Sequence, residues 1–283
     1  MLFRSRKIIK TDSEYGNAHI NMALSEKAIQ DYFSVNRDLA VVTGFIASDS
    51  QGRTTTLGRG GSDLSAALIA SAVGAKEIHI WTDVDGILSA DPHLVKTAFS
   101  LARLSYSEAM ELSHFGAKVL YPPSILPALA RGIPIRILNT FKPEAPGSII
   151  SCDDLGAEQA SRSPEPRRPK PSSPEPNRPE PRSPVKGISS IHAISLVRLQ
   201  GPGMVGVRGV SSRLFASLAR AGISVILITQ ASSEHSICFA IRPEEAAAAK
   251  QAISSEFEYE IARAAIEEPL VESELSIIAV VGA

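Results

Sequence analysis

Cysteine is scarce in this sequence, and charge of either sign is not in excess. The two cysteines, Cys152 and Cys238, fit neither a metal-ligand spacing nor a disulfide framework, so we interpret them as small apolar side chains in a reducing compartment. No metal site is predicted. Lysine and arginine total 29 and aspartate and glutamate 30, which gives a net charge of -1. Such a chain has no overall basic field to attract nucleic acid or an anionic membrane.

Long apolar runs and targeting segments are missing as well. The basic start, Met1 to Lys7, leads into no apolar stretch and does not read as a signal peptide. No run reaches the length that a membrane crossing needs, and we expect a cytoplasmic protein. What is present, 44% hydrophobic and 21% charged residues over 283 positions, is typical of one large or two ordinary globular domains.

Proline, by contrast, is concentrated in one segment. Residues 156–184 carry proline at nearly every second or third position, with charges between and almost nothing apolar. Such a segment cannot bury enough surface to fold, so we expect a disordered, semi-rigid spacer; an SH3-type ligand is the less favoured alternative. The spacer divides the chain into residues 1–155, 156–184 and 185–283.

Strands and helices are predicted to alternate in the first part. Buried-strand runs stand at residues 41–46, 77–81 and 134–138. Helices are predicted at 64–73, with Ser62 as the N-cap and Gly74 at the end, from the Ser105-x-x-Glu108 capping box to His114 with Gly116 beyond, and at 124–131 before Gly132. This order predicts a largely parallel α/β sheet.

The third part has a different order. Strands are predicted at 193–199, 223–229, 236–241 and 276–281, with helices at 207–221 and after Pro243. The order β-α-β-β-α-β is that of a ferredoxin-like fold.

The most informative motif is Thr54-Thr-Thr-Leu-Gly-Arg-Gly-Gly-Ser-Asp63, directly before a predicted helix. Its glycines let the backbone approach a ligand, and the helix N-terminus favours an anion. Arg59 can hold a carboxylate or phosphate, and Asp63 can pair with an ammonium group. Together they suit a zwitterionic amino acid, although a glycine-rich surface turn is the simpler alternative.

Two further motifs are weaker alone. Trp81-Thr-Asp-Val-Asp-Gly-Ile87 runs from a buried strand into an acidic turn, followed by Asp91-Pro-His93. Ligands bind at that edge of open α/β sheets, but a solvated loop explains the residues equally well. In Phe115-Gly-Ala-Lys-Val-Leu-Tyr-Pro122, Lys118 suits a phosphate contact or a plain helix end.

As an ordered set, these motifs and the run Asn139 to Gly147 resemble the aspartokinases of the amino-acid kinase family, across nearly all of residues 10–150 and again across 185–283. The sequence is most similar to the kinase portion of the bifunctional aspartokinase–homoserine dehydrogenases. The resemblance implies a three-layer α/β/α amino-acid-kinase sheet, here partial. It also implies transfer of the ATP γ-phosphoryl group to the side chain of L-aspartate, the first step toward lysine, methionine and threonine.

The resemblance also implies roles for single residues. Phe45, Arg59, Ser62 and Asp63 would bind aspartate, Thr82, Asp83 and Lys118 would bind the nucleotide, and Arg59, Asp63 and Lys118 would form the catalytic set. Leu88 and His93 occupy nucleotide-site positions where the family often has tyrosine and arginine. Phosphoryl transfer depends mainly on positioning and charge neutralisation, with Mg²⁺ bound through the ATP phosphates.

One departure from the family concerns its first strand, Lys-Phe-Gly-Gly-Thr, whose lysine contacts the transferred phosphate. Nothing in this sequence matches it, and a glutamate of the aspartate pocket would be missing as well. We therefore expect an incomplete form that phosphorylates aspartate poorly when isolated.

The third part resembles an ACT domain, which binds a free amino acid and pairs with a second copy. Gly201-Pro-Gly-Met-Val-Gly206 fits a dinucleotide pattern, but the next predicted strands form a hairpin, so we reject that site. The effector residues implied by the resemblance are Ser224, Gln230, Ala231 and Ser232, with threonine favoured over lysine; an ordinary polar strand end is the alternative. Ser276 to Gly282 resembles the first strand of a second ACT repeat.

Two other functions stay open at this point. A different amino-acid kinase is disfavoured by Arg59 with Asp63 and by the ACT segment. A non-catalytic regulatory subunit, which would bind an amino acid and pair with a full-length kinase, is favoured by the missing lysine strand.

Overall fold

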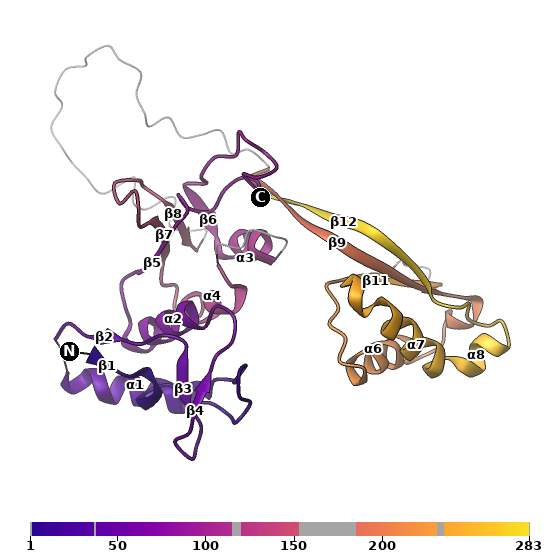
Figure 1. The fold of residues 1–283 in the computed structure, drawn as a ribbon, viewed down its shortest axis with the longest axis horizontal. Helices are drawn as coiled ribbons and strands as arrows, with labels where there is room; N and C mark the ends of the chain where they lie inside the picture. Colours follow the sequence, from indigo (N-terminus) through magenta and orange to yellow (C-terminus); the bar gives the residue numbers. More distant parts are fainter. Residues whose placement is uncertain (1, 37, 115–119, 153–184, 231–234, 283) are drawn as a thin grey trace, which may run out of the picture. The chain divides into compact units, whose positions relative to one another are not determined.

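The computed structural model describes residues 2–36, 38–114, 120–152, 185–230 and 235–282. They fall into two compact units (Figure 1), Met1–Ser189 with Ala279–Ala283 and Ser190–Ile278. The predicted spacer, residues 156–184, lies outside the described residues. Within the described ranges, no helix has both the length and the apolar character needed to span a bilayer.

The first unit alternates short strands with helices. Its elements are β1 (Leu2–Phe3), η1 (Ser5–Lys7), α1 (Met22–Val35), β2 (Val41–Val42), β3 (Ile46–Ser48), β4 (Thr54–Thr56), α2 (Gly61–Val73), β5 (Ile78–Thr82), β6 (Arg103–Ser105), α3 (Tyr106–His114), α4 (Pro122–Leu129), β7 (Ile135–Asn139) and β8 (Ser148–Ser151). Two small sheets, β1-β2 and β3-β4, accompany a four-stranded sheet in the order β5-β7-β8-β6.

The four-stranded sheet is mixed. Strands β5 and β7 are parallel, in register from Ile78 opposite Ile135 to Thr82 opposite Asn139. Strands β6 and β8 are also parallel, but β8 runs antiparallel to β7 because a short connection returns it directly alongside. The predicted strands at 77–81 and 134–138 are confirmed, each displaced by one residue. Isoleucine and leucine side chains of this sheet pack with α3 and α4 into the main core of the unit.

The predicted strand at 41–46 is wrong as a single buried element. The chain forms β2, breaks, and resumes as β3, and Val41 is 60% exposed. The break lies at Phe45, which has a φ of 70°. An apolar run predicts an extended strand, whereas this left-handed conformation depends on contacts with α2 that the run itself does not reveal.

The ends of the helices were predicted with mixed success. Helix α2 begins at Gly61 after a left-handed Gly60, not at Leu64, and Ser62 provides no cap; Gly74 ends the helix in the left-handed conformation as predicted. Helix α4 starts at Pro122, two residues before the predicted start, because proline suits the first turn of a helix. Gly116 lies outside the described residues.

The capping box of α3 is confirmed in both directions. The amide of Ser105 donates to Oε2 of Glu108 at 2.7 Å, and the amide of Glu108 donates to Oγ of Ser105 at 3.1 Å. These two bonds satisfy donors that every helix start leaves open.

The second unit has the predicted β-α-β-β-α-β order. Its elements are β9 (Gly187–Gln200), η2 (Pro202–Met204), α6 (Val210–Arg220), β10 (Leu227–Gln230), β11 (Ser236–Ile241), η3 (Pro243–Glu245), α7 (Ala246–Glu256), α8 (Glu258–Ala262) and β12 (Leu270–Val281). The start of β9, up to Ser189, and the end of β12, from Ala279, belong to the first unit. The sheet order is β10-β11-β9-β12, which is ferredoxin-like. Strands β9 and β12 run side by side, and α6 and α7 lie on one face of the sheet (Figure 1).

Strand β12 is longer than the predicted 276–281 and completes this sheet beside β9. That its last residues also open a second ACT repeat stays a prediction. The core of the unit gathers apolar side chains from β9, α6, β11 and α7, including the fully buried Phe239 and Phe257.

Candidate active site and effector pocket

The turn between β4 and α2 requires glycine at several positions. Gly58 and Gly60 have φ values of 71° and 67°, in the left-handed region that favours glycine. A Cβ on Gly60 would lie 2.4 Å from Cβ of Tyr121, and one on Gly61 would lie 2.9 Å from Cδ2 of Phe45. The glycines of the motif are therefore explained by conformation and by close packing.

Phe45 is tied to the same turn by backbone hydrogen bonds. The amide of Leu57 donates to the carbonyl of Phe45 at 3.0 Å. The amide of Phe45 donates to Oγ of Ser65 at 3.1 Å, and that hydroxyl donates to the carbonyl of Gly61 at 2.7 Å. The structure thus brings Phe45, which is 40% exposed, to the start of α2. Its role in binding aspartate stays a prediction.

Arg59 and Asp63 carry opposite charges on this turn. Arg59 lies in the exposed loop before α2, and Ser62 is exposed in the first turn of the helix. Asp63 follows in the same turn and is half-buried, and its burial raises the pKa of the carboxyl group. The positive end of the helix dipole adds to the attraction that Arg59 offers an anion. A ligand with a carboxylate and an ammonium group has both complements here.

A second polar group lies at the carboxyl ends of β5 and β7. Thr82 ends β5 and donates from Oγ1 to Oδ1 of Asp83 at 3.1 Å. The amide of Thr140 donates to the carbonyl of Thr82 at 2.8 Å, which holds the two strand ends together. Nδ2 of the buried Asn139 lies 2.5 Å from Oδ1 of Asp85.

Lys142 completes this group through the other oxygen of Asp85, with its Nζ 2.9 Å from Oδ2. The hydrogen bonds from Lys142 and Asn139 lower the pKa of Asp85. The edge of the sheet therefore presents the carboxylate of Asp85 together with a lysine. Sequence reasoning assigned no role to Lys142 or Asn139. The resemblance covered Asn139 to Gly147, which was the available signal.

The other predicted nucleotide-site residues lie on the following loop. Leu88 forms an isolated bridge with Ser100, and the amide of His93 donates to Oδ1 of Asp91 at 2.8 Å. Within the described part of the chain, no hydrogen bond or ion pair joins Leu88 or His93 to Thr82 or Asp83. Lys118 lies outside the described residues.

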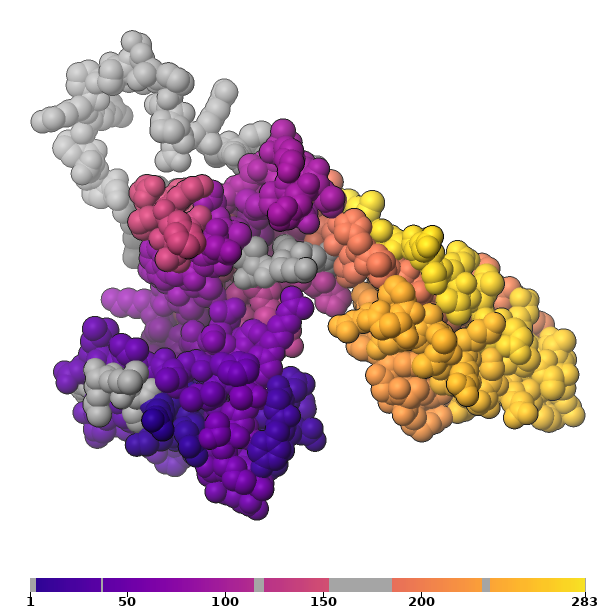
Figure 2. Space-filling model, in the orientation of Figure 1, coloured from indigo at the N-terminus to yellow at the C-terminus, as the bar shows by residue number. Residues whose placement is uncertain are grey.

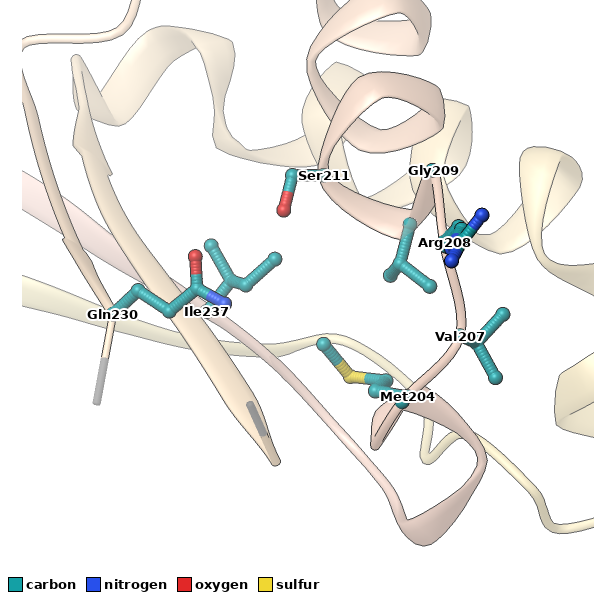
Figure 3. Close-up of a pocket in the computed structure, with 9 residues that line it drawn as sticks. Met204, Val207, Arg208, Gly209, Ser211, Gln230 and Ile237 are labelled. Atoms are coloured by element: carbon teal, nitrogen blue, oxygen red, sulfur yellow. The ribbon is translucent and has the colours of Figure 1, made fainter. Parts of the chain in front are cut away.

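The second unit contains a pocket of about 360 Å³. Its walls come from η2, the loop before α6, the start of α6 and the hairpin strands β10 and β11, and its residues are Met204, Gly206, Val207, Arg208, Gly209, Val210, Ser211, Gln230 and Ile237. Figure 3 shows the side chains of Gln230 and Ser211 facing each other across the space. The predicted effector residue Gln230 therefore lines a pocket.

The remaining effector predictions fare differently. Ser224 does not line this pocket and lies exposed between α6 and β10. Ala231 and Ser232 lie outside the described residues. Strand β10 pairs antiparallel with β11, as expected when the dinucleotide pattern was rejected. The lining residues from Gly206 to Ser211 were missed, although the preceding glycine-rich run was the signal.

Comparisons with known proteins identify a domain family in each part of the chain. Residues 4–139 match the amino acid kinase family, and residues 197–257 match the ACT domain. The first part of the chain therefore belongs to the amino acid kinase family, and the second part contains an ACT domain. Within that class, the chain is a relative of the aspartokinases.

Three relatives define that relationship. The bifunctional aspartokinase/homoserine dehydrogenase 1 of Arabidopsis thaliana is 40% identical over 259 residues, covering 91% of this chain and 26% of that protein. The bifunctional enzyme of Haemophilus influenzae is 41% identical over 269 residues, covering 95% of this chain and 30% of that protein. The structure of Escherichia coli aspartokinase III in complex with aspartate and ADP has a TM-score of 0.73 at 30% identity, covering 100% of this chain and 57% of that chain.

The shared region is thus nearly all of this chain but only part of each relative. The chain spans less than a third of the two bifunctional proteins. The amino-acid-kinase and ACT folds predicted from the sequence are confirmed.

Proposed function

We propose that this chain serves an aspartate kinase that transfers the γ-phosphoryl group of ATP to the side-chain carboxylate of L-aspartate. The observation that carries the proposal is the turn from Gly58 to Asp63, where an arginine and a half-buried carboxylate lie beside a helix N-terminus. Support also comes from a solved relative whose structure contains aspartate and ADP.

In this proposal the two charges of the turn orient the substrate. Arg59 binds the α-carboxylate of aspartate with its planar fork, and Asp63 accepts hydrogen bonds from the α-ammonium group. Phe45 and Ser62 border the substrate at the start of α2. The substrate is held by both charged groups on its α-carbon, which orients its side-chain carboxylate.

The carboxyl edge of β5 and β7 receives the nucleotide, with Thr82 and Asp83 as contacts and Lys118, Leu88 and His93 as further predicted ones. An oxygen of the aspartate side chain forms a bond to the γ-phosphorus while the bond from that phosphorus to the bridging oxygen breaks, and ADP leaves with the electron pair. Mg²⁺ arrives with the phosphates of ATP as part of the substrate. Among the described residues, no group of histidine, cysteine and acidic side chains forms a metal cage.

The pocket of the second unit takes a free amino acid as the regulatory ligand. The N-terminus of α6, whose first residues line the pocket, suits the ligand carboxylate, and Gln230 and Ser211 offer hydrogen bonds to a hydroxyl or ammonium group. L-Threonine is the favoured effector and L-lysine the alternative. The ACT domain would pair with that of a second copy.

A binding experiment on the full chain tests the proposal. Isothermal titration should detect binding of L-aspartate and, separately, of ADP with Mg²⁺, whereas succinate, which lacks the α-ammonium group that Asp63 binds, should bind the aspartate site much more weakly. Binding of threonine or lysine without any binding of aspartate or ADP would contradict a kinase function and favour a purely regulatory subunit.

A further inference from the structure

The predicted nucleotide site is rich in negative charge. Asp83 and Asp85 stand in the turn after β5, and Asp91 stands on the following loop. The phosphates of a nucleotide are anionic. Carboxylates near them repel the phosphates and weaken nucleotide binding unless cations compensate. Of the predicted contacts that the structure describes, Thr82, Asp83, Leu88 and His93, none carries a permanent positive charge.

Lys142 supplies a cation at this edge. It stands in the turn that follows β7, defined here as the β7 turn, residues 139–145. Two backbone hydrogen bonds shape this turn, from the amide of Lys142 to the carbonyl of Asn139 at 3.2 Å and from the amide of Ala145 to the carbonyl of Lys142 at 3.0 Å. Oδ1 of Asn139 also accepts from the amide of Phe141 at 2.8 Å.

The turn is anchored, while its outer side chains are accessible. Asn139 is only 4% exposed, whereas Phe141 is 80% exposed. Figure 2 shows the pink segment of the first unit, around residues 140 to 150, at the molecular surface. Asn139 therefore fixes the base of the β7 turn against Asp85, and Lys142 projects from a defined position.

The ion pair of Lys142 is easily exchanged. The side chain of Lys142 is 58% exposed and that of Asp85 is 42% exposed. Ion pairs this exposed contribute little to stability because water screens them, so an approaching phosphate can replace Asp85 at little cost. Asp85 keeps its hydrogen bond from Asn139 after the exchange, so the carboxylate is not left without a partner.

We propose that Lys142 is a phosphate-binding residue of the nucleotide site, which exchanges its ion pair with Asp85 for the nucleotide phosphates when a nucleotide binds. This inference rests on the proposed function. It adds a cation from the β7 turn to the predicted contacts Thr82 and Asp83 at the end of β5. In this proposal Asn139 is a positioning residue.

The chain contains a built-in probe for this site. Its one tryptophan, Trp81, precedes Thr82 in β5 and is 50% exposed. Nucleotide binding at the strand end should therefore change the tryptophan fluorescence. ADP and adenosine, each titrated in the presence of Mg²⁺, separate the contribution of the phosphates from that of the base and ribose.

Three variants of the full chain complete the experiment. Lys142→Met should weaken ADP binding about tenfold and leave adenosine binding within about twofold, because only ADP carries the charge that the ammonium contacts. Lys142→Arg should restore ADP binding to within about threefold, since it keeps the charge. Lys27→Met is the matched control: Lys27 is an exposed lysine on α1, 3.1 Å from Asp31, and its loss should change neither affinity.

Each outcome has a distinct meaning. Equal weakening of ADP and adenosine by Lys142→Met would show that the residue only shapes the turn, and unchanged ADP binding would show that it makes no contact; either result overturns the inference alone. Failure of the unaltered chain to bind ADP would contradict the proposed function and this inference with it.

Discussion

Nζ of Lys186 lies 2.7 Å from Oε2 of Glu108, the same oxygen that closes the capping box of α3. Lys186 is the second described residue after the proline-rich segment, and Glu108 is only 8% exposed. The neighbouring chain follows the same path, because the hydroxyl of Ser189 donates to the carbonyl of Leu112 at 3.2 Å. The start of β9 is thereby fastened to α3 within the first unit.

The charge of Glu108 should matter more than its shape. Burial raises the pKa of Glu108, but hydrogen bonds from Lys186 and Ser105 outweigh it, so the pKa lies below the ordinary value of 4.5. We expect Glu108→Gln, which keeps the size and a capping oxygen, to lower the free energy of unfolding by about 1–3 kcal/mol. Urea unfolding at neutral pH measures the loss.

The same variant has a defined pH signature. Because the folded pKa is depressed, the stabilisation from Glu108 is fully present above the unfolded pKa of 4.5 and is lost as the pH falls through the lower folded pKa. The stability difference between the unaltered chain and Glu108→Gln should therefore shrink in acid. Glu111→Gln, at an exposed position on the same helix, is the control, and an equal loss there would contradict the role of the ion pair.

A comparison of two glycines with the same backbone conformation separates the cost of backbone strain from the cost of a steric clash. Gly60 and Gly52 both have positive φ values, 67° and 73°, but a Cβ meets Tyr121 at 2.4 Å on Gly60 and nothing within 4 Å on Gly52. Gly52→Ala should cost about 1–2 kcal/mol from the left-handed conformation alone. Gly60→Ala should cost more by roughly 1–3 kcal/mol, since Tyr121 must move. Denaturant titration compares them, and equal losses would show that Tyr121 adapts freely.

Aspartate binding should depend on pH through Asp63. Burial raises the pKa of this carboxyl group above its ordinary value of 3.8, and only the ionised form pairs with an ammonium group. The affinity for L-aspartate should therefore fall as the pH drops through that raised pKa. Asp63→Asn should bind aspartate weakly and lack this pH step; a step that persists in the variant would assign it to another group.

The regulatory pocket should respond to one side chain in particular. Gln230→Ala should weaken binding of L-threonine by about tenfold, because the variant removes a hydrogen-bonding amide that faces Ser211. Thr229→Ala, on the same strand but outside the pocket lining, should change little. Calorimetric titration measures both, and equal effects would place the effector elsewhere.

Local signals predicted local structure well. The spacing of Ser105 and Glu108 was sufficient for the capping box, and Gly74 for the end of α2, because each depends on neighbours in the sequence. The break at Phe45 could not be predicted in this way. Its left-handed conformation is held by Ser65, a residue twenty positions away.

The candidate site shows the same limit. Arg59 and Asp63 were found because they share one motif, whereas the contact of Lys142 with Asp85 joins residues 57 positions apart in the sequence that meet because β5 pairs with β7. The effector pocket combines Gln230 with Gly206 to Ser211, which come from two segments that the sequence alone does not bring together. Contacts between residues that are distant in the sequence can be identified only once the pairing of the strands is known.

The central claim is that the Gly58–Asp63 turn recognises an amino-acid substrate and not the nucleotide. The measurement is the dissociation constant of L-aspartate and of ADP for the unaltered chain and for Arg59→Ala. The account predicts that the variant weakens aspartate binding at least about tenfold, because a charge-assisted pair is lost, while ADP binding is unchanged. Equal weakening of both ligands, or weakening of ADP alone, would contradict it.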